Sequence, residues 1–330
     1  GQGAVVMASG MAAITNACLA LLRAGDEFVT GNSLFMSSYV LFANIFKKYN
    51  ITARFVESTD LAALENAIND KTRFIWLETI GNPKMDVPDL AATAELAHRH
   101  GLPLMVDNTM ATPYLCRPIE LGADVVIHST TKYLSGHGDA TGGVVIDSGK
   151  FNWASGRHPL YDKPDTSYHG LRWGHDLPEP LAPLAFILRM RTVPLRNIGA
   201  CISPDNAWLS LQGIETLPLR IERHCANSKA VAEHLLNHDA VEWVRYPGLA
   251  SDPEFEKNKK YLKGMGGGMV VFGIKGGADA GKKFIESLGL FSHLANVGDA
   301  KSLAIHPATT THSQLNEDQQ AAGGITPELI

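Results

Sequence analysis

The sequence predicts an α/β protein built on a mostly parallel sheet that helices cover on both faces. Two observations carry this prediction. Short apolar segments alternate with segments of helical periodicity along the first half of the chain. These apolar segments are nearly continuous, which is typical of strands buried on both faces. In such a sheet, ligands bind beyond the carboxyl ends of the strands, so the residues that follow each strand are the candidates for function.

Capping and turn signals divide the first half of the chain into elements. Ser9 and Asp60 stand where a side chain can cap a helix, and apolar-periodic residues follow each of them. The predicted helices cover residues 9–22, 39–48, 61–68 and 89–99. The predicted strands cover residues 27–30, 53–56, 73–78, 102–106, 124–127 and 143–147.

The second half of the chain has a different pattern. Residues 150–204 mix aromatic residues, histidines and prolines without a clear period, which predicts a long irregular excursion. Further helices are predicted at 207–217, 219–236 and 281–288, and further strands at 268–274 and 302–306. With 330 residues the chain is long enough for two domains. We expect a large domain over residues 1–216 and a smaller α+β domain over residues 217–330.

Composition excludes several classes of partner. The net charge is −5, the pI is about 6.2, and no basic block stands out, so nucleic acid and anionic membranes are not expected partners. The four cysteines lie far apart without a C-x-x-C pair, which predicts reduced thiols of a cytoplasmic protein and no metal site. No apolar run is long enough to cross a bilayer, and the first residues lack the pattern of a signal peptide.

The segment after the strand at 124–127 carries the main candidate for chemistry. It reads S-T-T-K, ends at Lys132, and leads into a glycine-rich run. A partly desolvated lysine is nucleophilic, and the hydroxyls of Ser129 and Thr131 can hold an anion. Together these features suit a Schiff base with a phosphorylated aldehyde, which means pyridoxal phosphate. The alternative is a surface lysine in a polar loop, the commoner case for so short a motif.

Other polar residues follow neighbouring strands. Glu78 and Asn82 come at and after the end of the strand at 73–78, and Asp107 follows the strand at 102–106. A carboxylate at such a place can pair with a protonated pyridine nitrogen, and the alternative is a turn or helix cap. Gly10 and Met11 open the first helix, where free N–H groups and the helix dipole attract a phosphate. An ordinary capped helix is the alternative there.

These residues together resemble the cysteine/methionine-metabolism (trans-sulfuration) family of pyridoxal-phosphate enzymes, which has fold type I. The lysine stretch fits the family signature from Asp124 through S-T-T-K-Y-L-S-G-H-G. The resemblance extends over nearly the whole chain, at 9–11, 77–79, 82–83, 106–109, 203–204, 211–213, 222–224, 306–307 and 311–313. Within the family it most resembles the O-acetylhomoserine sulfhydrylases (aminocarboxypropyltransferases), through 151–157 with 164–165 and 167–170, through 290–302, and through 322–327.

The resemblance implies a role for each matching residue. Lys132 would form the Schiff base and then move protons, and Asp107 would pair with the pyridine nitrogen. The N–H groups of Gly10 and Met11 and the hydroxyls of Ser129 and Thr131 would bind the phosphate. The residues expected beside the cofactor ring are Glu78, Asn82 and Phe35, and those expected near the substrate are Asn296 and Thr311.

The implied reaction is γ-replacement on O-acetylhomoserine with sulfide or a thiol, giving homocysteine or methionine. A γ-lyase or a cystathionine synthase of the same family is one alternative, and a non-catalytic binding protein on this fold is another. A nicotinamide dehydrogenase is disfavoured because no G-x-G-x-x-G follows a strand. The acyl group of the substrate, acetyl or succinyl, and the sulfur donor stay open.

Three further expectations come from the resemblance. Many members have a tyrosine where this chain has Phe35, which can stack on the pyridine ring but cannot hydrogen-bond or accept a proton. The family assembles as a homotetramer, a dimer of dimers with shared active sites. The Tyr/Arg pair that a neighbouring subunit lends to the phosphate would precede Gly1, and the arginine for the substrate carboxylate would follow Ile330. We therefore expect an N-terminal arm and a C-terminal end beyond these residues.

Overall fold

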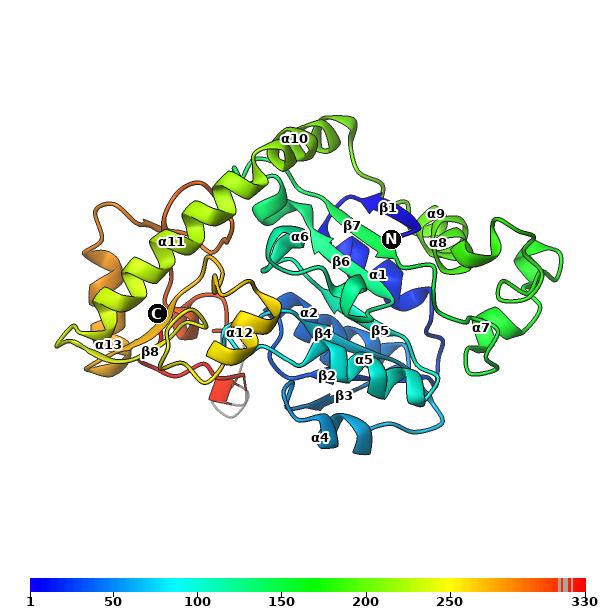
Figure 1. The fold of residues 1–330 in the computed structure, drawn as a ribbon, viewed down its shortest axis with the longest axis horizontal. Helices are drawn as coiled ribbons and strands as arrows, with labels where there is room; N and C mark the ends of the chain where they lie inside the picture. The colour runs from blue at the N-terminus through cyan, green and yellow to red at the C-terminus, as the bar shows by residue number, and fades with distance from the viewer. Residues whose placement is uncertain (314–315, 317–319, 322) are drawn as a thin grey trace.

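The computed structural model describes residues 1–313, 316, 320–321 and 323–330. The described residues form a seven-stranded sheet with the order β1-β7-β6-β5-β4-β2-β3 (Figure 1). Its strands are β1 (Gly3–Met7), β2 (Glu27–Gly31), β3 (Thr52–Val56), β4 (Thr72–Glu78), β5 (Leu104–Asp107), β6 (Val125–Ser129) and β7 (Gly143–Asp147).

The sheet is mostly parallel, as the sequence predicts. Strands β3, β2, β4, β5 and β6 pair in parallel, while β7 runs antiparallel to both β6 and β1. The six predicted strands of the first half are present with small shifts at their ends. Strand β1 was not predicted, because it lies at the sheet edge and its residues alternate between buried and exposed positions.

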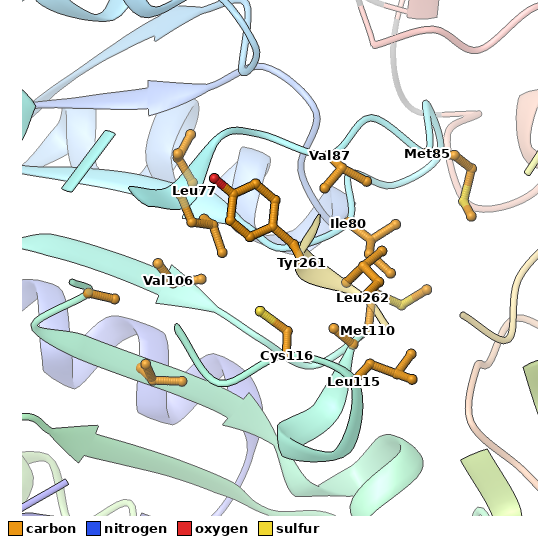
Figure 2. Close-up of a cluster of buried hydrophobic side chains, with 14 of the residues drawn as sticks. Leu77, Ile80, Met85, Val87, Val106, Met110, Leu115, Cys116, Tyr261 and Leu262 are labelled. Atoms are coloured by element: carbon orange, nitrogen blue, oxygen red, sulfur yellow. The ribbon is translucent and has the colours of Figure 1, made fainter. Parts of the chain in front are cut away.

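Helices cover both faces of the sheet, which confirms the α/β class. Along β4, Phe74 and Trp76 point into one core while Ile75 and Leu77 point into the other, as the two-residue period of a strand requires. The first core packs against α1, α3 and α8, and the second against α4, α5, α6 and α11. Figure 2 shows part of the second core, whose labelled side chains include Leu77, Val106, Leu115 and Tyr261.

The helices of the described residues vary widely in length. They are α1 (Gly10–Leu19), α2 (Met36–Val40), α3 (Phe46–Lys48), α4 (Leu61–Asn66), α5 (Leu90–Arg99), α6 (Thr112–Leu115), α7 (Pro159–Asp162), α8 (Ala185–Met190), α9 (Arg196–Ile198), α10 (Pro204–Glu215), α11 (Leu217–Leu236), α12 (Phe255–Tyr261) and α13 (Gly277–Glu286). Wider π turns occur at η1 (Leu41–Ile45), η3 (Thr130–Leu134) and η6 (Arg191–Leu195). Short 3₁₀ turns occur at η2 (Pro118–Leu121), η4 (Thr166–Tyr168), η5 (Ala182–Leu184) and η7 (Pro307–Thr309).

Helix α11 leads from α10 at the large sheet to the C-terminal part of the chain (Figure 1). There, β8 (Val241–Arg245) and β9 (Val271–Ile274) pair antiparallel, and β10 (Ser292–His293) pairs in parallel with β11 (Leu303–Ala304). Strand β8 was not predicted, and the strand expected at 302–306 is reduced to β11. The expected boundary after residue 216 falls between α10 and α11 and stays a prediction.

Three observations complete the description. No helix among the described residues is long and apolar enough to cross a bilayer. The four cysteines are free, and only Cys201 is exposed. Ala322, the first residue of the predicted motif at 322–327, lies outside the described residues.

Candidate functional site

The strand ends that the sequence marks as candidates meet at one edge of the sheet. Glu78 ends β4 and lies opposite Asp107, which ends β5. Asp107 in turn lies opposite Ile127 of β6, and Ser129 ends that strand two residues later. Because these strands are parallel, their carboxyl ends lie at the same edge of the sheet, where ligands of such sheets bind.

A hydrogen-bonded chain links two of these ends. The backbone N–H and the hydroxyl of Thr109 both donate to Asp107 Oδ1, at 2.9 and 2.5 Å. The backbone N–H of Ser129 donates to Thr109 Oγ1 at 2.8 Å. Thr109 therefore fixes the Asp107 carboxyl group relative to the end of β6. Sequence reasoning included Thr109 in the matching stretch 106–109 but assigned it no role, although an aspartate commonly hydrogen-bonds the backbone two residues later in a turn.

The two carboxyl groups at this edge are buried. Burial raises the pKa of Asp107, and the two hydrogen bonds from Thr109 offset part of that shift. Burial also raises the pKa of Glu78 well above its usual range, and repulsion from Asp107 adds to the shift. The remaining contact of Glu78 is structural, since its Oε1 accepts the N–H of Phe35 at 2.8 Å. This bond holds the loop between β2 and α2 over the strand ends, with the Phe35 ring 39% exposed.

Lys132 lies in the π turn η3, directly after β6. Its backbone is not helical (φ −91°, ψ −128°), so the chain bends at this residue. The side chain is half-buried, and burial lowers the pKa of its amine, which favours the neutral, nucleophilic form. Lys132 Nζ donates to Asn296 Oδ1 at 2.6 Å. The structure thus brings together two candidates that lie 164 positions apart in the sequence.

The start of α1 lies against the end of β6. The Ser9 side chain caps the helix by accepting the N–H of Ala12 at 3.0 Å, as predicted. A Cβ on Gly10 would lie 2.6 Å from Ser129 Cβ, so only glycine allows this close approach. The first N–H groups of a helix, here those of Gly10 and Met11, have no carbonyl partner within it. The Ser129 hydroxyl lies beside this helix start, and such an arrangement of donors is suited to a phosphate.

The remaining candidates from the sequence are Thr131, Asn82 and Thr311, and their contacts with the other site residues are less direct. The hydroxyl of Thr131 donates to the carbonyl of Gly142 at 3.2 Å and accepts that residue's N–H at 3.1 Å. Asn82 is half-buried in the loop after β4. The hydroxyl of Thr311 lies 2.9 Å from His312 Nδ1. For Asn82 and Thr311, the expected position beside ring and substrate stays a prediction.

The chemistry of these groups fits pyridoxal phosphate. The edge holds a half-buried amine on Lys132, a buried carboxyl group on Asp107 that can pair with a ring nitrogen, and backbone N–H groups at the start of α1 that can bind an anion. Among the described residues, no group of three or more histidine, cysteine, aspartate or glutamate side chains could hold a metal ion.

Comparisons with known proteins agree with this arrangement. The family model described as "Cys/Met metabolism PLP-dependent enzyme" matches residues 1–330. The O-acetyl-L-homoserine sulfhydrylase of Leptospira meyeri is 48% identical over 100% of this chain and 76% of its own length. The homocysteine synthase of Schizosaccharomyces pombe is 44% identical over 100% of this chain and 77% of its own length.

A solved structure gives the same result for the fold. A Campylobacter jejuni protein named as an O-acetylhomoserine (thiol)-lyase, with a pyridoxyl-lysine monophosphate residue, superposes with a TM-score of 0.93 at 37% identity. The match covers 99% of this chain and 77% of that one. The fold is therefore fold type I of the pyridoxal-phosphate enzymes. The chain belongs to the Cys/Met metabolism PLP-dependent enzyme family, and its cofactor is pyridoxal phosphate.

The link through Thr109 can be tested by stability. Replacing Thr109 with valine removes the hydroxyl donor to Asp107 and the acceptor for the Ser129 N–H. We expect the free energy of unfolding to fall by about 1–3 kcal/mol at pH 8. The pKa of Asp107 is already raised above its ordinary 3.8 and should rise further. A carboxyl group with a raised folded-state pKa contributes stability that is fully present below its ordinary pKa of 3.8 and is lost as the pH rises through the raised pKa. Because the substitution raises this pKa further, the variant should lose less stability relative to the wild type at pH 5 than at pH 8.

Thr93→Val provides the matched control for chemical denaturation at the two pH values. The hydroxyl of Thr93 is also buried, but it donates to the backbone carbonyl of Asp89 at 2.8 Å. Its loss should therefore be equal at pH 5 and pH 8. An equal loss for Thr109→Val at both values would contradict the link to an ionising carboxyl group.

The region beside Gly10 can be tested by cofactor binding. Gly10→Ala places a methyl group against Ser129 and should force the helix start away from β6. We expect Kd for pyridoxal phosphate to rise about ten-fold or more, which is about 1.4 kcal/mol. The measurement is a fluorescence titration of the cofactor-free protein. Gly289→Ala is the control, because a Cβ there meets nothing within 4 Å. Wild-type affinity in Gly10→Ala would rule out the proposed anion site.

Proposed function

We propose that the protein catalyses pyridoxal-phosphate-dependent γ-replacement on O-acetyl-L-homoserine. Sulfide or a thiol takes the place of the acetoxy group, and the products are homocysteine or methionine plus acetate. The observation that carries the proposal is the similarity, over the whole chain, to relatives named as O-acetyl-L-homoserine sulfhydrylases and as homocysteine synthase. The half-buried amine of Lys132 beside Asn296 supports it with a group able to move protons.

The residues at the strand ends have distinct tasks in this proposal. The bound cofactor supplies an electron sink for the negative charge that develops on the substrate. Lys132 Nζ takes the proton from the substrate Cα and moves the further proton at Cβ, and Asn296 orients the amine. Asp107 keeps the ring nitrogen protonated, since its carboxylate is the natural partner of a pyridinium. Thr109 supports the ionised form of that carboxylate by donating two hydrogen bonds.

Other residues hold the cofactor and substrate in place. The N–H groups of Gly10 and Met11 and the hydroxyls of Ser129 and Thr131 would bind the phosphate. Phe35, Glu78 and Asn82 would hold the pyridine ring. Asn296 and Thr311 would contact the substrate. Because Phe35 has no hydroxyl group, the proton transfers depend on Lys132.

The proposal extends to organisation. A cofactor-binding large domain over 1–216 is joined by α11 to a small domain over 217–330. The active unit is a cytoplasmic homotetramer, a dimer of dimers, in which neighbouring subunits share their sites. Four free cysteines without a disulfide support a reducing compartment.

Turnover tests the proposal directly. The holoenzyme is assayed with O-acetyl- and O-succinylhomoserine, each with and without sulfide, and the release of homocysteine and 2-oxobutanoate is measured. We expect sulfide-dependent homocysteine formation from the acetyl ester. Lys132→Ala should abolish both turnover and the visible absorbance band of the lysine-bound cofactor, while Lys229→Ala, at an exposed position of α11, should keep both.

Each of the other outcomes would indicate a different function for the protein. Release of 2-oxobutanoate without added sulfide would indicate a γ-lyase. Preference for the succinyl ester, together with cystathionine formation when cysteine replaces sulfide in the same assay, would indicate a cystathionine synthase. The absence of a visible band with added pyridoxal phosphate would indicate a binding protein without this chemistry.

A further inference from the structure

The side chain of Arg220, in the first turns of α11, lies on the turn that carries Lys132. Its Nη1 donates to the carbonyl of Tyr133 at 2.7 Å, and its Nη2 approaches the carbonyl of Leu134 at 3.4 Å. The same Nη2 donates to the carbonyl of Gly213, at the end of α10, at 2.6 Å. One guanidinium group therefore joins the lysine turn to the junction between α10 and α11.

The guanidinium group lies directly against the backbone of this segment. A Cβ on Gly136 would meet Arg220 Nη1 at 2.1 Å, so no side chain fits between them. Arg220 is also fixed from its own helix, because its Nε donates to Thr216 Oγ1 at 3.1 Å. These contacts hold an arginine that is only half-buried in one orientation.

The segment that contains Asn296 also packs against the lysine turn. A Cβ on Gly298 would lie 2.4 Å from the backbone nitrogen of Tyr133 and 2.9 Å from the carbonyl carbon of Lys132. The turn is therefore contacted both by Arg220 and by residues 296–298. Its non-helical bend is at Lys132, directly before the Tyr133 carbonyl that Arg220 binds.

We propose that Arg220 is a positioning residue for Lys132, which holds the turn after β6 so that the amine reaches Asn296 and the reacting carbon. The proposal rests on the function proposed above for Lys132. Arginine suits the task because its planar group presents several donors in a fixed geometry and is always charged, so three carbonyls can be held by one side chain. A lysine at this position could hold only part of that arrangement.

Helix α11 links the lysine turn to the C-terminal part of the chain. This helix runs from the large sheet into the C-terminal part of the chain (Figure 1). Residues 296–298, which also contact the lysine turn, belong to that C-terminal part. Arg220 therefore joins the lysine turn to the helix that leads to this second contacting segment. A small displacement of the amine is costly, since a misplacement of about 1 Å can reduce a rate about a hundred-fold.

The test compares Arg220→Ala and Arg220→Lys with Arg223→Ala. Arg223 lies one helical turn further along α11, is exposed, and carries the same charge, so it is the matched control. Two quantities are measured. The first is kcat and KM for γ-replacement in the holoenzyme. The second is the pKa of the Lys132 amine in the cofactor-free protein, from the pH dependence of its labelling by an amine-reactive reagent, read by peptide mass spectrometry. Thermal unfolding shows that each variant is folded.

We expect Arg220→Ala to lower kcat about ten- to a hundred-fold with little change in KM, because the amine is misplaced but substrate contacts remain. The Lys132 amine should become more accessible, so its pKa should rise toward the ordinary value. Arg220→Lys should fall between the wild type and Arg220→Ala, and it provides the test if the alanine variant does not fold. Arg223→Ala should match the wild type.

The inference is wrong if folded Arg220→Ala keeps the wild-type kcat and labelling pKa, or if both Arg220 variants lose only thermal stability. The labelling measurement needs no turnover. It therefore separates a failure of this inference from a failure of the proposed reaction, which would appear as an inactive wild type.

Discussion

The parallel register of β4, β5 and β6 is the constraint on which the site depends. It places Glu78 opposite Asp107 and Asp107 opposite Ile127, so that three chain segments end at the same edge. Lys132 follows in the turn just beyond β6. A slip of one residue in any of these strands would turn its final side chain to the other face of the sheet. The two apolar cores on the faces of β4 oppose such a slip, because it would move Phe74 and Leu77 each into the core packed for the other face.

Few hydrogen bonds compensate for the burial of the two carboxyl groups at this edge. Asp107 and Glu78 are both buried, and burial raises the pKa of each carboxyl group. Their protein partners are hydrogen-bond donors, Thr109 for Asp107 and the backbone of Phe35 for Glu78. A protonated pyridine nitrogen would supply a positive charge beside Asp107, whose carboxyl group accepts hydrogen bonds only from the neutral groups of Thr109 among the described residues. Burial also lowers the pKa of the Lys132 amine. Such perturbed pKa values are typical of a functional site, and a bound cofactor would supply charged partners there.

The sequence predicted those parts of the molecule that depend on local signals. The caps at Ser9 and Asp60 and the six strands of the first half are present because each depends on neighbouring residues. The parallel class followed from continuous apolar segments, and the positions of Glu78 and Asp107 at one edge followed from the class. The helix expected at 39–48 instead begins at Met36 and contains the π turn η1, because packing of its aromatic residues against Phe28 is a tertiary effect.

The contacts that orient Lys132 could not be predicted from local sequence signals. Asn296 was placed near Lys132 by resemblance alone, since 164 positions separate the two residues. Arg220 gave no signal, because its partners at Tyr133 and Leu134 are backbone carbonyls 87 and 86 positions away. Strands β1 and β8 were missed because their residues are partly exposed and their pairing partners are distant. Long-range backbone contacts leave no pattern of side chains in the sequence.

The position of the reactive amine is the claim on which the site and its chemistry rest. It is tested by adding pyridoxal phosphate to the purified protein, reducing the mixture with borohydride, and mapping the modified peptides by mass spectrometry. A partly buried amine beside Asn296, with a pKa lowered by burial, should take the pyridoxyl group selectively, so the label should appear at Lys132 and follow the concentration of the bound cofactor. A label that is spread over exposed lysines, or found mainly at a residue other than Lys132, would contradict the assignment.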